Sequence, residues 1–369
     1  MSAHRGTDQQ ATGEARVPSE PRAGRAARGG LSRVGLSRVG RPRAGALAVA
    51  GVVTAALPLS LDRAQLTVYI LLGLYAIVAT GVSLLMGYAG QVSLGQMAFY
   101  AVGAYTAAVM SVHGLPPLLG LAAAPVFAFV VAAIVGIPLL RLRGHYLAFA
   151  TLAFLLIFVA VAGQQDFLGG AIGLQDIPPL GVGSLQFVSF RSYAWVTWIA
   201  VVLVMLVSYN IIDSRPGRGL RALATSEVAA ESSGVDVGRY KLFVFGLSAA
   251  FAGLAGAIYA FFIASISPAV FSVQLSLQFV VIAVVGGLGT ITGPVVGSAI
   301  VTLLIQGLND LATRPGMPEH AAVVSNYAAY AVLLIIIVLA MPGGVVPTVG
   351  ALVRRRLRPA RPATRAVQP

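Results

Sequence analysis

Long apolar runs separated by short polar stretches fill the chain from residue 45 to residue 342. A helix that crosses a lipid bilayer needs about 20 mostly apolar residues and satisfies its own backbone hydrogen bonds. Ten segments of this character are present: 45–61, 66–86, 92–112, 116–140, 145–163, 193–212, 241–263, 274–289, 291–308 and 325–342. The pattern predicts an all-α integral membrane protein with about ten transmembrane helices, some of them broken or re-entrant.

Two of these regions are interrupted by glycine and polar residues. The first reads "GYAGQVSLGQMAFYAVGAY", residues 87–105, and the second reads "GGLGTITGPVVG", residues 286–297. Backbone released from a helix is tolerated in a membrane only where protein buries it or water reaches it, and paired breaks often flank a transport path. One interpretation is a neutral polar path lined by these residues: Gly87, Gly90, Gln91, Ser93, Gln96, Gly286 and Gly289. The alternative is close helix packing, a common use of glycine in membrane helices.

The composition agrees with a membrane protein and excludes several kinds of chemistry. Apolar residues make up 57% of the chain and charged residues 10%, with a mean hydropathy of +0.86, whereas about 25% of the residues in soluble proteins are charged. The chain has no cysteine, four scattered histidines and no phosphate-binding G-x-x-x-x-G-K-[ST] motif. The predicted spans also lack acidic residues that a proton relay would need. We therefore expect no catalytic residues, no metal, no cofactor and no enzymatic activity.

Lysine and arginine are concentrated in two tails, residues 1–44 and 346–369, and in the loop 213–241. Cytoplasmic loops of membrane proteins collect these residues. With the N-terminus in the cytoplasm, 22 of the 25 basic residues fall on the cytoplasmic side. This asymmetry predicts an even number of spans, eight or ten, with both termini cytoplasmic. The net charge of +13 is then a signal of membrane topology, so we expect mobile basic cytoplasmic tails and no nucleic-acid partner.

The loop 213–241 is the one cytoplasmic segment long enough to meet a partner protein. Its sequence predicts a break at Pro216 and Gly217, then a helix from about residue 219 to 233 that ends at Gly234. Four residues form the predicted apolar stripe of this helix: Leu220, Leu223, Val228 and Ala229. An amphipathic connector on the membrane surface and a helix that docks a partner both remain open at this point.

Four blocks together resemble the permease subunits of branched-chain amino acid ABC importers of the LivM type. They are "GYAGQVSLGQMAFYAVGAYTAA", "RLRGHYLAFATLAF", "SRPGRGLRALATSEVAAESSGVDVGRYKLFVFGLSAAFAGLAGAIYA" and "VVGGLGTITGPVVGSAI", in that order between about residues 60 and 345. The resemblance implies a permease domain over 45–345 in the cytoplasmic membrane. It also implies two ATP-binding subunits, a second permease subunit and an extracytoplasmic solute-binding protein as partners. Urea or short amides as solutes, and a passive channel, remain alternatives.

The run "SEVAAESSG", residues 226–234, resembles the coupling loop that docks into the ATP-binding subunit of such importers. The resemblance implies a coupling role for residues that match the loop or precede it: Arg218, Arg221, Glu227, Ala229, Ala230 and Gly234. The small residues allow close docking, and the two arginines can pair with an acidic partner surface or with lipid phosphates.

Overall fold

The computed structural model describes residues 57–142, 144–182, 185–312, 331, 332, 335 and 343–357. Its α-helices are α2 (Arg63–Ala89), α3 (Gln96–Val112), α4 (Pro117–Leu139), α5 (His145–Gln164), α6 (Phe190–Asp213), α7 (Arg215–Thr225), α8 (Glu227–Ser232), α9 (Val237–Ile263), α10 (Val273–Gly286), α11 (Gly293–Ala312) and α13 (Val345–Leu357). Three 3-10 turns accompany them: η1 (Leu57–Leu59), η2 (Asp166–Leu168) and η3 (Pro268–Val270). A small antiparallel ribbon pairs β1 (Gly181–Val182) with β2 (Leu185–Gln186).

Eight of the ten predicted segments correspond to helices of this structure, while 45–61 and 325–342 fall largely outside the described residues. Six stretches of the described chain are long and apolar enough to cross a membrane: α2, α4, α5, α6, α9 and the stretch Pro268–Gly286, which contains α10. Helix α3, with 17 residues, is shorter than these six stretches. The all-helical prediction is therefore confirmed for the described part, apart from the short ribbon.

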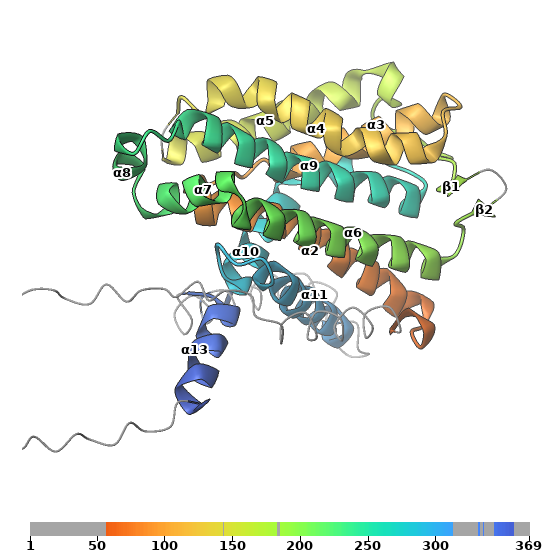
Figure 1. Ribbon diagram of the computed structural model, residues 1–369. Coiled ribbons are helices and arrows are strands. Elements are labelled where there is room, and N and C mark those ends of the chain that lie inside the picture. The colour runs from red at the N-terminus through yellow and green to blue at the C-terminus, as the bar shows by residue number, and fades with distance from the viewer. Residues whose placement is uncertain are drawn as a thin grey trace, which may run out of the picture. The chain divides into compact units, whose positions relative to one another are not determined.

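Helices α2, α3 and α9 are the inner helices; α4 packs on α3 and α9, and α6 packs on α2 (Figure 1). Most residues of α2 are buried, whereas only five of the 23 residues of α4 are. Small residues allow the inner helices to approach: a side-chain carbon on Gly103 of α3 would collide with the backbone of Gly253 of α9. The outer helices expose Val126, Phe127 and Ile199, which are apolar side chains suited to lipid.

A break is present where one was predicted, but it lies at Ser214, between α6 and α7, and not at Pro216 and Gly217, because α7 already begins at Arg215. The side chain of Ser214 accepts a hydrogen bond from the Gly217 N–H at 3.4 Å and caps the helix. Proline is compatible with this first turn, since the first N–H groups of a helix have no intrahelical partner. The cap therefore places the break at Ser214, and Pro216 and Gly217 lie in the first turn of α7.

The single predicted helix is instead two, because the chain turns at Ser226. The Ser226 hydroxyl accepts from the Ala229 N–H at 3.3 Å and starts α8 as a new helix. The predicted end at Gly234 is confirmed: its φ is +81°, and the Val235 N–H donates to the Ala230 carbonyl at 3.0 Å. Helices α7 and α8 lie together at one end of the bundle, away from the β1–β2 ribbon (Figure 1).

The C-terminal tail expected to be mobile from residue 346 begins with a helix, α13. Its sequence places apolar residues at helical spacing, at Val345, Val349 and Leu352. The prediction of a mobile tail rested on the arginines that follow and did not use this spacing. The tail 1–44 lies outside the described residues.

Candidate functional site

The interruption predicted after Gly87 separates α2 from α3. Helix α2 ends at Gly90, whose φ of +63° is left-handed, and the Gln91 N–H donates to the Leu85 carbonyl at 3.3 Å. Non-helical backbone then runs to Gly95, and α3 begins at Gln96. The bundle thus contains a helix end and a helix start joined by a short irregular segment, residues 90–95, which we call the α2–α3 break.

Two hydroxyl groups hold the α2–α3 break in place. The Leu94 N–H donates to Thr151 Oγ1 of α5 at 3.0 Å, and the Leu94 carbonyl accepts from Ser276 Oγ of α10 at 2.5 Å. Gly95 lies against α5 so closely that a side-chain carbon on it would collide with the Thr151 carbonyl. The C-terminal part of the break, Leu94 and Gly95, is therefore packed between α5 and α10, whereas Gly90 and Val92 are exposed. In a membrane, irregular backbone requires either such packing or contact with water.

The polar side chains of the break, and that of Gln96 at the start of α3, are buried with atoms that have no hydrogen-bond partner in the described part of the protein. This holds for Gln91 Oε1, Ser93 Oγ and both amide atoms of Gln96. All three residues are at most 5% exposed. Leaving one such group unpaired costs about 1–3 kcal/mol, so a cluster of three requires an explanation beyond packing.

The second interruption lies between α10 and α11 and packs on the end of α2. The Gly289 N–H donates to the Ser83 carbonyl at 3.3 Å, and the Tyr88 hydroxyl donates to the Gly289 carbonyl at 3.2 Å. A side-chain carbon on Gly87 would collide with the Gly289 backbone. Two glycine-rich segments that are about 200 residues apart in sequence therefore lie side by side.

The glycines of the predicted path have local structural roles in this arrangement. Gly87 and Gly289 permit the contact just described, and Gly286 lies against the backbone of Gly293. Gly90 has no atom within 4 Å of its missing side chain, so the positive φ accounts for it. Close packing therefore explains Gly87 and Gly286, and a positive φ explains Gly90 and Gly289, but neither explains the unpaired side chains.

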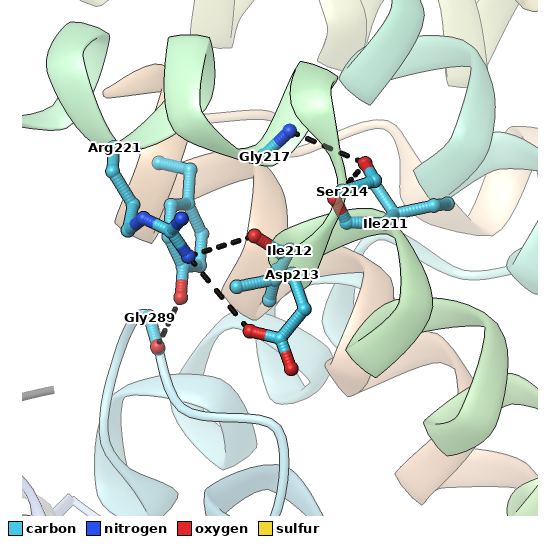
Figure 2. Close-up of polar contacts among 8 residues, drawn as sticks. Ile211, Ile212, Asp213, Ser214, Gly217, Arg221 and Gly289 are labelled. Carbon is cyan, nitrogen blue, oxygen red and sulfur yellow. Dashed lines mark hydrogen bonds and ion pairs between the residues drawn. The ribbon is translucent and has the colours of Figure 1, made fainter. Parts of the chain in front are cut away.

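Helix α7 is fixed to the end of α6 and lies close to the second interruption. Arg221 Nη1 donates to the Ile212 carbonyl at 2.7 Å and lies 3.9 Å from Asp213 Oδ1 (Figure 2). The same view draws Gly289, which accepts the Tyr88 hydroxyl bond at the C-terminal end of α2. Helix α7 also packs directly on α2. Helix α7 is thus in direct contact with the helix that ends at the α2–α3 break.

The predicted apolar stripe is correct for α7 and wrong for α8. Leu220 and Leu223 are buried, whereas Val228 is 76% exposed and Ala229 is exposed as well. The turn at Ser226 changes the direction of the chain, so helical spacing cannot be carried across it. The sequence did not predict that Val228 would be an exposed apolar side chain.

The residues assigned to coupling are divided between the surface and the interior. Arg218, Glu227, Ala229 and Gly234 are exposed, and the Glu227 carboxylate pairs with Lys241 Nζ at 2.5 Å. Two further residues face inward: Ala230 is fully buried, and the Arg221 guanidinium is engaged within the chain as described above. The described residues contain no group of three or more His, Cys, Asp or Glu suited to a metal ion.

Comparisons with known proteins agree on one family. Residues 65–341 match the family model described as "Branched-chain amino acid transport system / permease component". The chain is 31% identical to the high-affinity branched-chain amino acid transport system permease proteins LivM of Salmonella typhimurium, over 269 residues, and of Escherichia coli, over 264 residues. Each match covers 65% of this chain and 62% of the relative. The permease protein LivH of Escherichia coli is 27% identical over 290 residues, covering 73% of this chain and 90% of that protein.

Proposed function

Because the chain belongs to the family of permease components of branched-chain amino acid transport systems, we propose that it is a transmembrane subunit of an ATP-binding-cassette importer. It forms part of the translocation path for branched-chain amino acids in the cytoplasmic membrane. It assembles with a second permease subunit, two ATP-binding subunits and an extracytoplasmic solute-binding protein. This proposal draws on the relatives, of which the chain spans 62% of the length for LivM.

The unpaired polar cluster in the α2–α3 break is the observation that supports a path most directly. Gln91, Ser93 and Gln96 are neutral donors and acceptors within an apolar bundle. A zwitterionic solute needs such groups to replace its water, and it needs them without a fixed charge that would trap it. Their burial means that a solute reaches them only after neighbouring helices separate, as alternating access requires.

The arrangement of α7 and α8 supports coupling to an ATP-binding subunit. The two short helices present Arg218, Val228 and Ala229 at the surface of one end of the bundle. Arg221 and the packing of α7 on α2 connect that surface to the break. We propose that the docking surface consists of α8 and the exposed face of α7, with Val228 at its centre, and that it lies in the cytoplasm.

The topology completes the proposal. We propose ten spans within residues 45–345, with the basic tails 1–44 and 346–369 on the cytoplasmic side. The concentration of arginine in these tails and in the 213–241 loop supports this orientation.

To test the proposal, the tagged chain is purified from its native membrane and the co-purified ATP-binding subunit is measured. The ATPase activity of the eluate is then measured with the binding protein and leucine, isoleucine, valine or urea. Val228→Asp is expected to remove the ATP-binding subunit from the eluate, because it places a charge at the centre of an apolar contact. The matched control is Val188→Asp, which changes a 69% exposed valine before α6 and should leave co-purification unchanged. A wild-type chain that purifies alone and equilibrates solute without ATP would contradict the importer.

A further inference from the structure

The α2–α3 break contains a helix start that no side chain caps. Gly95 is the N-cap residue of α3, and no side-chain hydrogen bond caps the helix there. The first N–H groups of a helix have no intrahelical partner and carry a partial positive charge, equivalent to about half an elementary charge. Only a long bond of 3.4 Å joins the Met97 N–H to Ser276 Oγ. An anion is therefore stabilised at this position.

A second observation at the same place independently indicates a ligand. Gln96 lies in the first turn of α3, is fully buried and has both amide atoms unpaired. Ser93, three residues earlier, is 1% exposed and its hydroxyl is unpaired too. An amide NH2 group and a hydroxyl group are donors that a carboxylate oxygen accepts from directly.

We propose that the start of α3, with Gln96 and Ser93, binds the α-carboxylate of the transported amino acid; this inference rests on the proposed function. The end of α2 lies on the other side of the same break and has the opposite partial charge, which suits the α-ammonium group. Tyr100, one turn further along α3, packs against Phe271 and Phe279 at ring-centroid distances of 6.4 and 6.2 Å. These rings provide an apolar surface for an aliphatic side chain.

The charge distribution of the surrounding helices explains why such a site suits transport. Helices α3, α5 and α10 contain no Lys, Arg, Asp or Glu. A carboxylate that enters the break thus meets neutral donors and a helix dipole instead of a guanidinium. A bound solute must also leave, and donors without a full charge give a weaker, reversible interaction.

The absence of cysteine from the chain permits a direct test with single-cysteine variants in the assembled transporter. Ser93→Cys is treated during ATP turnover with anionic 2-sulfonatoethyl methanethiosulfonate or with its cationic trimethylammonium counterpart. The control is Ser111→Cys, since Ser111 is also buried and unpaired but lies at the opposite end of α3. We expect the anionic-to-cationic rate ratio to be about tenfold higher at Ser93→Cys than at Ser111→Cys. Leucine should protect Ser93→Cys, and leucinamide, which lacks the carboxylate, should not.

Equal ratios at the two positions, no labelling of Ser93→Cys during turnover, or equal protection by leucinamide would overturn the carboxylate site. Gln96→Leu gives a second test that does not depend on labelling. It removes an unpaired amide, so the thermal stability should be unchanged or higher, while leucine uptake falls about tenfold through the lost donors. Unchanged uptake by Gln96→Leu would also overturn the site. Leucine uptake by the wild-type assembly is measured in the same vesicles, and its absence would instead contradict the proposed function.

Discussion

The hydroxyl of Thr151 provides a quantitative test of how the α2–α3 break is held. Thr151 Oγ1 accepts from the Leu94 N–H at 3.0 Å and donates to the Ala148 carbonyl at 2.9 Å. Thr151→Val replaces the hydroxyl by a methyl group of similar size, so the packing around this 1% exposed side chain is largely kept. The change removes the acceptor of one buried N–H group.

The size of the effect follows from this geometry. A buried donor left unpaired costs about 1–3 kcal/mol of folding free energy. The control is Thr197→Val in α6, because Thr197 is fully buried and its hydroxyl has no partner in the described part of the protein. The same chemical change there removes an unpaired polar group and is expected to be neutral or stabilising. The two variants therefore differ in the sign of their effect on stability.

The assay is thermal unfolding of the purified protein in one detergent, with both variants measured beside the wild type. One kcal/mol shifts the midpoint by about 2–4 °C in a domain of roughly 200 residues, so Thr151→Val should unfold several degrees below Thr197→Val. Thr151→Val should also slow uptake, because it removes a hydrogen bond that holds the break, and residues of the break line the proposed path. Equal midpoints, or a lower midpoint for Thr197→Val, would refute the role assigned to Thr151.

Two further variants test the contacts around the break. Gly87→Ala should destabilise the protein and reduce uptake, because the added methyl group collides with Gly289. The control is Gly163→Ala in α5, where nothing lies within 4 Å of the added carbon, and it should raise the unfolding midpoint slightly. A Gly87→Ala protein as stable as the wild type would contradict the contact. Arg221→Met removes a charged hydrogen bond to Ile212 and should cost about 1.5–3 kcal/mol, while Arg218→Met, at an exposed position, should leave the midpoint unchanged. Matching midpoints for the two arginine variants would exclude Arg221 as the connection between α7 and α6.

The sequence predicted the helices of the described bundle well, because a bilayer restricts a span to one backbone form and a narrow range of lengths. The break after Gly87 was also predictable, since Gln91, Ser93 and Gln96 interrupt an apolar run within a few residues of one another. Their burial without partners supports the interpretation made from residue type, although the path itself remains a prediction.

The rest depended on contacts that no local pattern contains. The Gly87–Gly289 approach joins residues 202 positions apart, so neither glycine could be assigned to packing from its own neighbourhood. The caps at Ser214 and Ser226 decided where α7 and α8 begin. The Ser214 cap starts α7 two residues before the expected break ends, and the Ser226 cap divides the expected helix. That division buried Ala230 and exposed Val228, which an unbroken helical stripe would not predict.

The pairing of Glu227 with Lys241 has a practical consequence, because Lys241 is the only lysine in the chain. Apart from a free α-amino group, amine-reactive esters can therefore modify only this side chain, which lies next to the proposed docking surface for the ATP-binding subunit. The Lys241 side chain is 20% exposed, so its acylation rate depends on how far the Glu227 carboxylate and any neighbouring subunit shield it. The acylation rate of Lys241, measured by mass spectrometry of the peptide that contains it, would therefore report whether the proposed docking surface is covered by the proposed ATP-binding subunit.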